Sequence, residues 1–473
     1  MTQLPLHDVD KLRPLDAKPA VYSPLTHAPT TTTTTRQRGT TPAASLPTEL
    51  LLRIFELMPM MYAGEVREDL VAWTVTSTCP DLPKVARVCR GWRTAAQLSL
   101  FHSVSLIRRK HVLGFLDVAR RRPDLAQRVA AMHIGLVDGT PELSEPYERQ
   151  VEMSDLFIEA LTLVPNVRHL LVNQMRKSDT WRFIDVLEQL ELSTLALKLY
   201  DPNTSNRETA VLVQPSDVYR AFSLPTLRAF ELNFRPTWPR RSDYAVPVVK
   251  SNVECMSVTV NAPKGLIPML SAAGPSLVRL NIYTEHVLNP EAATTAFSTL
   301  VNLRELRFES NVPALSSDAA PPPAAAARRA APTSAGRNDW LEPLLPLYTR
   351  LQRLSISEQA ASATFLGVLP RGVAVAEYIS WDRRPDTVLC ALEDALLDSR
   401  ARGRADAGAG AGAGEGTHLA LPRLVLAVDE EAFEESVDEA DLERVVKAFA
   451  ARGCEFAVAF EPMDVPQLRW VDT

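Results

Sequence analysis

The sequence predicts an α/β protein in two parts: a small all-α module, then an irregular array of α/β repeats. Two helix-like apolar patterns precede residue 100, and a short strand-like pattern then returns repeatedly along the chain. A chain of 473 residues also exceeds one ordinary core, because domains usually hold roughly 100–200 residues. We therefore expect the module at residues 45–103 and the array at residues 104–473.

The composition is that of a folded chain. Apolar residues make up 46% and charged residues 23%, which excludes disorder throughout, and no apolar run reaches the ~18 residues of a membrane span. The net charge of −6 argues against a nucleic-acid partner. The five cysteines are scattered without a CxxC pair, and no apolar signal segment begins the chain. We expect a cytoplasmic or nuclear protein with no membrane partner.

Three segments of biased composition lie outside these regular patterns, one before the module and two within the array. Residues 1–44 are rich in proline and threonine and have no helix or strand period, so we expect a disordered tail. Residues 314–336 combine a proline triplet with an alanine run, and residues 401–416 contain an alternating alanine–glycine run. We expect both to be low-complexity insertions in the array. The glycine spacing of the second does not fit a phosphate-binding GxGxxG loop.

The module begins with an amphipathic helical pattern. Its apolar residues recur at i, i+1, i+4, i+5 and i+8, which places them in one broad stripe of a helix. Pro47 suits the start of that helix, because its missing N–H would have no partner in a first turn, and Pro59 marks the end. The stripe consists of Leu50, Leu51, Ile54, Phe55 and Met58.

A second helical pattern covers residues 82–96, after an insertion at residues 59–80. Val85, Val88, Cys89, Trp92 and Ala96 share one face of this helix. We expect the cysteine on that face to be a small buried hydrophobe rather than a nucleophile.

These two patterns resemble an F-box, the three-helix module through which subunits of SCF-type ubiquitin ligases bind the Skp adaptor. The resemblance rests on Leu46-Pro47, followed by Leu50 and Ile54-Phe55, and on the motif Val88-Cys89-Arg90-x-Trp92-Arg93 with a closing Leu100-Phe101. The insertion at residues 59–80 is longer than the spacer that a compact F-box normally has between these helices. Phe101 stands at a position where a tryptophan is common. The resemblance implies a Skp-family adaptor as partner and, through it, a cullin. The partner-binding residues that it implies are Leu46, Pro47, Leu50, Ile54, Phe55, Val88, Cys89 and Trp92.

The apolar face of so small a module also indicates binding on physical grounds. A segment of ~60 residues buries too little surface to be stable with an apolar face left free. The face therefore docks on a partner or packs on the rest of the chain. Helical periodicity alone favours internal packing, whereas the ordered Leu-Pro and Val-Cys-Arg-x-Trp motifs favour a partner.

The array is predicted from a repeated frame φxxφxφ, in which φ is apolar. In the first nine frames the central residues are 24 to 38 positions apart, except for one gap of 48 that contains residues 314–336. Without that insertion the gap is roughly 25, inside the ~20–29-residue period of leucine-rich repeats. The frames are Phe101/Val104/Leu106, Val129/Met132/Ile134, Val167/Leu170/Val172, Leu192/Leu195/Leu197, Leu227/Phe230/Leu232, Val253/Met256/Val258, Leu277/Leu280/Ile282, Leu303/Leu306/Phe308, Leu351/Leu354/Ile356 and the weaker Val373/Ala376/Tyr378 and Leu421/Leu424/Leu426.

Helical stretches precede several frames, so the repeating unit is a helix, a turn and a short strand. Because such a unit cannot bury its apolar side alone, neighbours stack into parallel strands backed by helices. We therefore expect an irregular leucine-rich-repeat-like solenoid, with an ordinary α/β domain as the alternative. The asparagine ladder of regular repeats is mostly missing. The expected helices cover residues 181–190, 266–272, 292–300, 340–348 and, at the end, 434–449.

The sequence contains no pattern typical of catalysis or metal binding. The eight histidines form no HExxH, and neither GxSxG nor a Walker loop occurs. The acidic run at residues 429–435 is interpreted as a solvated face rather than a metal site. Trp238 and Arg240-Arg241 could recognise an acidic motif, although an exposed basic loop without function is the simpler interpretation. We expect no catalytic residue, cofactor or metal.

The sequence thus favours a substrate-recognition subunit of an SCF-type E3 ubiquitin ligase. In this hypothesis, the module binds the Skp adaptor and the solenoid binds an unidentified target protein. The first alternative is a non-catalytic repeat scaffold for protein–protein interaction, in which the F-box-like helices only cap the solenoid. The second is an enzyme whose site is assembled from scattered residues.

Overall fold

The computed structural model describes most of the array and part of the module. The described residues are 46–52, 54, 90–136, 146–173, 180–198, 215–234, 250–260, 263–284, 288–310, 339–380, 385–406 and 421–460. All belong to one compact unit, residues 46–473. The predicted tail 1–44, the module insertion 59–80 and the insertion 314–336 lie outside the described residues.

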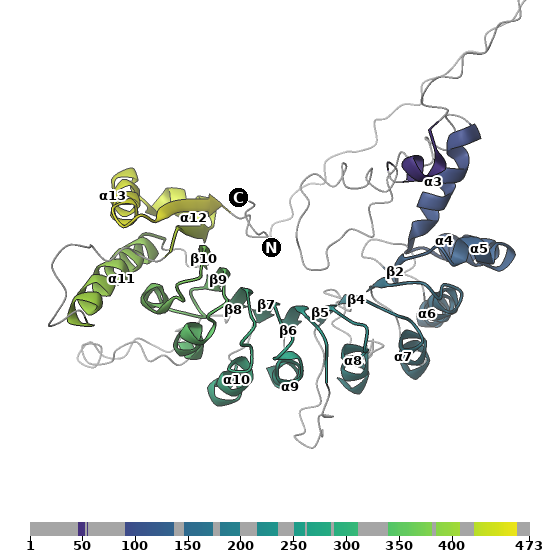
Figure 1. Cartoon of the computed structure of the whole chain (residues 1–473), viewed down its shortest axis with the longest axis horizontal. Coiled ribbons are helices and arrows are strands. Elements are labelled where there is room, and N and C mark those ends of the chain that lie inside the picture. Colours follow the sequence, from purple (N-terminus) through teal and green to yellow (C-terminus); the bar gives the residue numbers. More distant parts are fainter. Residues whose placement is uncertain are drawn as a thin grey trace, which may run out of the picture. The chain divides into compact units, whose positions relative to one another are not determined.

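Twelve parallel strands form one sheet, and each strand pairs with the next one along the chain (Figure 1). This confirms the α/β class and an open, solenoid-like array. The strands are β1 Ser103–Leu106, β2 Ala131–Ile134, β3 His169–Val172, β4 Thr194–Lys198, β5 Ala229–Phe234, β6 Cys255–Val260, β7 Arg279–Thr284, β8 Glu305–Ser310, β9 Arg353–Ser357, β10 Val375–Ile379, β11 Arg423–Val428 and β12 Glu455–Phe460.

Helices follow the strands and lie along one side of the sheet (Figure 1). The helix before the sheet is α3 Arg90–His102. The others are α4 Arg109–Arg121, α5 Pro123–Ala126, α6 Tyr147–Thr162, α7 Thr180–Glu188, α8 Pro215–Phe222, α9 Pro263–Ala273, α10 Pro290–Phe297, the 3-10 helices η3 Asp339–Leu347 and η4 Ala363–Val368, α11 Pro385–Asp406, α12 Glu430–Ser436 and α13 Glu439–Ala450.

Proline and capping residues fix where several helices begin. Helices α8, α9, α10 and α11 start at a proline, whose fixed φ and missing N–H suit a first turn. The Asn289 side chain accepts a hydrogen bond from the Ala292 N–H and caps α10. The predicted helix 340–348 is instead the 3-10 helix η3, because Pro343 and Pro346 remove two N–H donors inside it.

Two other predictions needed correction at the C-terminal end. The single helix expected at 434–449 is two helices, α12 and α13, since Val437 leaves the helical conformation and Asp438 begins a new helix. Residues 401–406, which were expected to belong to an insertion, instead continue α11. Residues 407–420 lie outside the described part.

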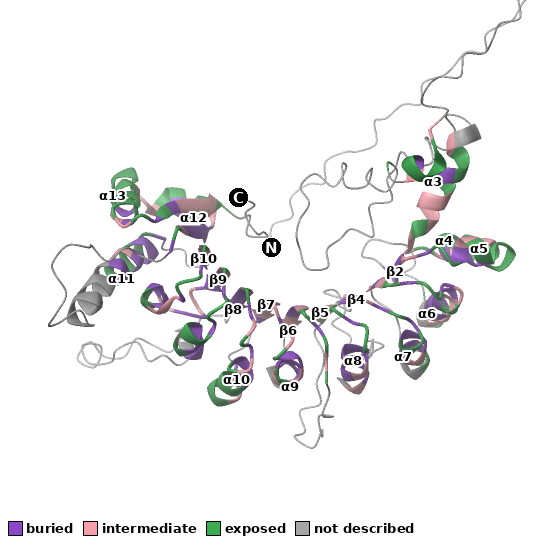
Figure 2. Ribbon diagram, in the orientation of Figure 1, coloured by how far each residue is buried: buried purple, intermediate pink, exposed green. Residues whose placement is uncertain are grey.

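One hydrophobic core runs between the strands and the helices from β1 to β12 (Figure 2). The parallel register aligns the central residue of each frame with its neighbours, so that Leu280 lies between Met256 and Leu306. Side chains two apart on a strand share a face. Each of the eleven frames therefore corresponds to a strand whose apolar face packs on the helices.

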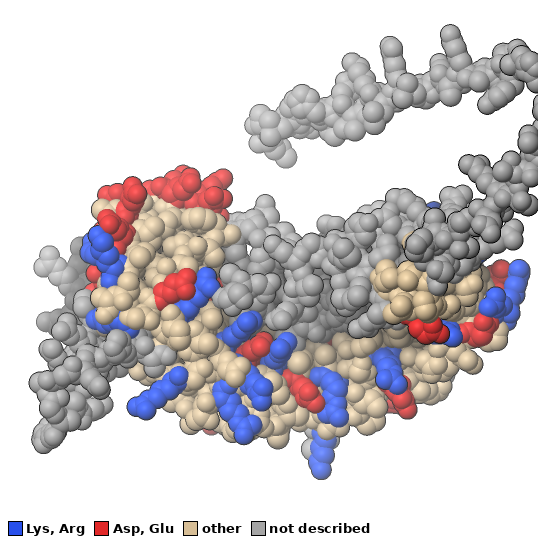
Figure 3. All heavy atoms as spheres, turned by 45° about the horizontal axis from the view of Figure 1, so that its top comes forward, with Lys and Arg blue, Asp and Glu red and all other residues tan. Residues whose placement is uncertain are grey.

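Charged side chains are unevenly distributed along the array. Figure 3 shows a dense group of Asp and Glu at the end that carries α12 and α13, and mainly Lys and Arg along the middle. In α12, Glu430, Glu431, Glu434 and Glu435 are exposed. Asp429 instead caps the helix by accepting a hydrogen bond from the Ala432 N–H at 2.8 Å. The acidic run is therefore a solvated helix face with one capping residue.

Candidate functional site

The module presents an exposed apolar pair on its first helix. Residues 48–52 and 54 are helical, and the Leu51 N–H donates to the Pro47 carbonyl at 3.1 Å. Leu50 is 53% exposed and Ile54 is 46% exposed. Because residues four apart lie on the same side of a helix, these two side chains form one apolar surface in contact with solvent. We call Leu50 and Ile54 the helix pair.

The other side of this helix packs on α3. Leu51, Ala95 and Ala96 are buried together, and Leu46 and Trp92 pack against them while half-buried. These residues form a small core separate from the core of the array. The apolar stripe predicted for the first helix is therefore divided, because Leu51 packs internally and the helix pair does not.

The structure thus separates the predicted partner-binding residues into three groups. Leu50 and Ile54 are exposed, and Pro47 is exposed beside them. Leu46 and Trp92 contribute to the small core. Phe55, Val88 and Cys89 lie outside the described residues, as do Trp238, Arg240 and Arg241.

On the face of the sheet opposite the helices, a row of polar side chains crosses five strands. The row follows the register from β6 to β10 and consists of Ser257, Asn281, Arg307, Ser355 and Glu377, all buried. The Asn281 side chain donates to the Ser257 hydroxyl at 2.9 Å, and the Ser355 hydroxyl donates to the Glu377 carboxylate. Among the described residues, the Asn281 amide oxygen has no hydrogen-bond partner.

Arg307 is the central cation of this polar row. It is only 1% exposed, and its guanidinium forms an ion pair with Glu309 and lies 3.9 Å from the Glu377 carboxylate. Burial raises the pKa of Glu377, although Arg307 and the Ser355 hydroxyl act in the opposite direction. These buried charges interact mainly with one another, so this part of the strand face is a structural element rather than a free surface.

A buried histidine lies on the same face at the first strands. The His133 Nδ1 is 3.2 Å from the Ser105 hydroxyl, and its Nε2 accepts a hydrogen bond from the Asn173 amide at 2.8 Å. Desolvation, with a smaller effect from Lys198, lowers the pKa of His133 to about 4. The imidazole is therefore neutral at physiological pH, with its proton on Nδ1.

A ladder of polar side chains connects the turns that lead into the strands. Asn166, Thr226, Asn252, Ser276 and Asn302 each stand three residues before a strand. Each lies within hydrogen-bond distance of a backbone carbonyl oxygen in the preceding turn. We call these residues the turn ladder.

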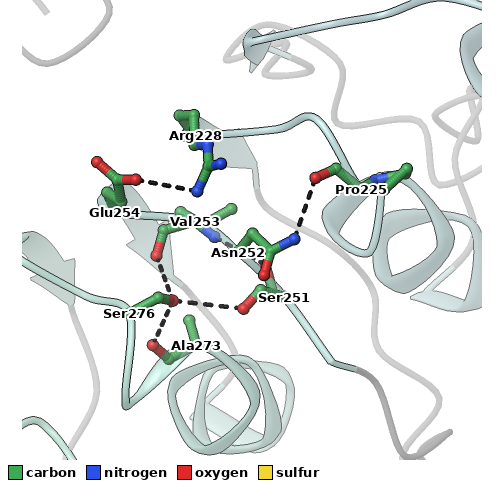
Figure 4. Close-up of polar contacts among 8 residues, drawn as sticks. All are labelled: Pro225, Arg228, Ser251, Asn252, Val253, Glu254, Ala273 and Ser276. Carbon is green, nitrogen blue, oxygen red and sulfur yellow. Dashed lines mark hydrogen bonds and ion pairs between the residues drawn. The ribbon is translucent and has the colours of Figure 1, made fainter.

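Figure 4 shows two steps of this turn ladder. The Asn252 amide donates to the Pro225 carbonyl at 3.0 Å, and the Ser276 hydroxyl lies 2.8 Å from the Val253 carbonyl. Beside them, the Arg228 guanidinium pairs with Glu254 at 3.0 Å. These hydrogen bonds to backbone carbonyls hold neighbouring turns at a fixed spacing. Sequence reasoning missed the ladder, although the recurrence of Asn, Thr or Ser at this position was a visible signal.

Neither a metal centre nor a membrane span is found in the described part of the chain. Its His, Cys, Asp and Glu residues form no group of three or more that could hold a metal ion. None of the helices described there has both the length and the apolar character needed to cross a bilayer.

No family model matches the chain, and no curated protein sequence matches it significantly.

Proposed function

We propose that this chain is a substrate-recognition subunit of an SCF-type E3 ubiquitin ligase. Its module binds a Skp-family adaptor, which connects it to a cullin, and its leucine-rich-repeat-like solenoid binds a target protein. The observation that supports this most is the exposed helix pair, Leu50 and Ile54, on a helix whose opposite side already packs on α3.

The energetics of the helix pair favour a partner. Two large aliphatic side chains four residues apart remain about half exposed, while Leu51 on the same helix is buried. Burying the exposed half of each side chain in a groove would contribute about 1 kcal/mol. Contiguous apolar surface that stays in contact with solvent is typical of an interaction site.

The separate core of the module supports the same proposal. Leu51, Ala95 and Ala96 are buried in a cluster that does not merge with the array core. Because the module has its own core, its outer face can bind one partner while the array binds another. In this proposal the subunit does not itself catalyse the formation of a covalent bond. It raises the effective concentration of a target's lysines near a ubiquitin-loaded enzyme carried by other subunits.

One observation favours the alternative of a repeat scaffold capped by these helices. Phe101, at the end of α3, packs against the array core, and α3 contacts β1 and α5. A capping role requires these contacts but does not explain why the side chains of the helix pair remain exposed.

The two functions are distinguished by affinity purification of the full chain from cells with the proteasome inhibited. A ligase subunit brings down a Skp-family adaptor and a cullin, together with ubiquitylated target. A purification that contains partners of the array but neither adaptor nor cullin would support the scaffold and contradict the ligase.

A further inference from the structure

The turns that lead into β8, β9 and β10 form an exposed basic surface. Their described residues, 298–304, 347–352 and 369–374, include three arginines and no Asp or Glu. Arg304, Arg350 and Arg371 are all exposed. None of the three forms an ion pair with a described residue, whereas Arg228 in an earlier turn pairs with Glu254. In a chain of net charge −6, this is a local excess of unpaired positive charge.

Two of the most exposed large apolar side chains lie in the same turns. Val301 is 54% exposed and Leu347 is 51% exposed. We call Val301, Arg304, Leu347, Arg350 and Arg371 the turn patch. A surface that combines apolar side chains with unpaired arginines fits a partner that carries both apolar and acidic groups.

The backbone holds this turn patch in a fixed arrangement. The Gln352 N–H donates to the Arg304 carbonyl at 2.7 Å, and the Ala374 N–H donates to the Gln352 carbonyl at 2.8 Å. The Arg350 guanidinium donates to the Asn302 side chain at 2.8 Å, which holds it over the neighbouring turn. Strands β8, β9 and β10 are neighbours in the sheet, and adjacent parallel strands are about 4.8 Å apart, so the three turns before them form one continuous surface that a single extended segment can cross.

We infer that the turn patch binds an acidic peptide segment that also carries apolar side chains. The inference rests on the proposed function only in calling the owner of that segment a target. The strand face from β6 to β10 is the competing surface, but its polar row is buried and internally paired. A nucleic acid is a poorer fit, because its phosphates offer nothing to Val301 and Leu347 and the chain as a whole is acidic.

The test is fluorescence anisotropy with the purified full chain and a labelled, extended peptide of alternating acidic and leucine residues. A peptide with glutamine in place of each acid is the first control. The test variant is the triple substitution Arg304→Gln, Arg350→Gln and Arg371→Gln. The matched control is Arg128→Gln, Arg168→Gln and Lys250→Gln, which removes the same charge from exposed residues in other turns.

The turn patch predicts about a tenfold loss of affinity in the test triple and less than about twofold in the control triple. It also predicts a loss of up to about thirtyfold in Val301→Ser with Leu347→Ser, from about 1 kcal/mol for the exposed half of each side chain, and weaker binding at high salt. Equal losses in the two triples would overturn the inference, because net charge alone would then explain binding. Tighter binding of a single-stranded oligonucleotide than of the acidic peptide would also overturn it.

Self-association at low salt that the test triple abolishes would assign the turn patch to a second copy of this chain and contradict the proposed partner. Adaptor binding is measured separately on the same variants. If the peptide binds as predicted but no adaptor does, the turn patch stands and the ligase function fails. The reverse result contradicts the turn patch alone.

Discussion

His133 gives a quantitative prediction about how pH affects the stability of the array. Its ring is buried between the Ser105 hydroxyl and the Asn173 amide, and burial lowers its pKa from 6.5 to about 4. Protonation at Nε2 would place a proton opposite the amide that donates there. A histidine whose pKa is lower in the folded state contributes stability above its unfolded pKa, and this stability is lost as the pH falls toward the folded pKa.

The size of the effect follows from the two pKa values. As the pH falls from 7 to 5, the excess of protons that the unfolded state binds at this site rises from about a quarter to nearly one. With one pKa unit equal to about 1.4 kcal/mol, the free energy of unfolding falls by about 2 kcal/mol over this range. Stability above pH 7 is unaffected by this residue.

The assay compares urea unfolding of the wild type and the variant His133→Gln at pH 7 and pH 5. Glutamine stays neutral and can still accept from the Asn173 amide. We expect the wild type to lose about 2 kcal/mol more than the variant on acidification. Equal losses in the two proteins would refute the assignment of His133 as a buried neutral histidine.

Three further predictions concern single residues of the array. Burial raises the pKa of Glu377 above 4.5, so the stability that this carboxyl contributes is lost as the pH rises from its unfolded pKa through its folded pKa. Urea unfolding over a pH series above 4.5 should therefore show a smaller fall in unfolding free energy for Glu377→Gln than for the wild type. Gly135 has a φ of 107°, and a Cβ there would lie 2.7 Å from a backbone oxygen, so Gly135→Ala should destabilise the protein by more than about 1 kcal/mol. A Cβ at Gly114 on α4 would point into open space, so Gly114→Ala should stabilise the protein by about 0.5 kcal/mol. Thermal unfolding of both variants is the measurement, and equal shifts would contradict the prediction. Asn252→Ala removes the hydrogen bond to the Pro225 carbonyl and should lower the free energy of unfolding by about 1 kcal/mol. Denaturant unfolding measures this against a Ser271→Ala control outside the turn ladder. No loss in Asn252→Ala would contradict the stabilising role of the turn ladder.

The strands of the array could be predicted from the sequence because one face of each is apolar. All eleven apolar frames coincide with strands β1 to β11. Strand β12 was missed because Gly453 occupies the first position of its frame, with φ of 73° at the end of α13. Its other apolar positions, Phe456 and Val458, fit the pattern. A helix-ending glycine thus concealed the last repeat.

Helix type and helix ends were less predictable. The apolar residues over Trp340–Tyr348 follow the spacing of an α-helix, and only the two prolines inside the segment indicate the 3-10 helix η3. The division between α12 and α13 depends on Val437, which has no sequence signal of its own. Periodicity reports which side of a segment is buried, but it does not report its hydrogen-bond pattern.

The candidate sites could be predicted only in part. The helical stripe identified Leu50 and Ile54 correctly as helical, but periodicity could not show that Leu51 packs on α3 and the other two do not. Likewise, the sequence analysis did not single out Arg307, because nothing in a strand pattern reveals that the face opposite the helices is buried at β8. A strand pattern shows which side chains share a face, but not whether that face is covered.

The central claim is that the helix pair binds a Skp-family adaptor, and a dissociation constant measures it directly. The purified full chain is titrated with purified adaptor in an isothermal calorimeter, as wild type and as the double variant Leu50→Ser with Ile54→Ser. Leu113→Ser with Val446→Ser is the matched control, because Leu113 and Val446 are also exposed apolar residues on helices. Equal thermal unfolding of the three proteins establishes that the fold is intact.

We predict that the wild type and the control bind the adaptor equally, and that the helix-pair variant binds about thirtyfold more weakly. This is the equivalent of about 2 kcal/mol from the exposed halves of two aliphatic side chains. Undiminished binding by the helix-pair variant would show that another surface is responsible. Absence of binding by the wild type would contradict the proposed function itself.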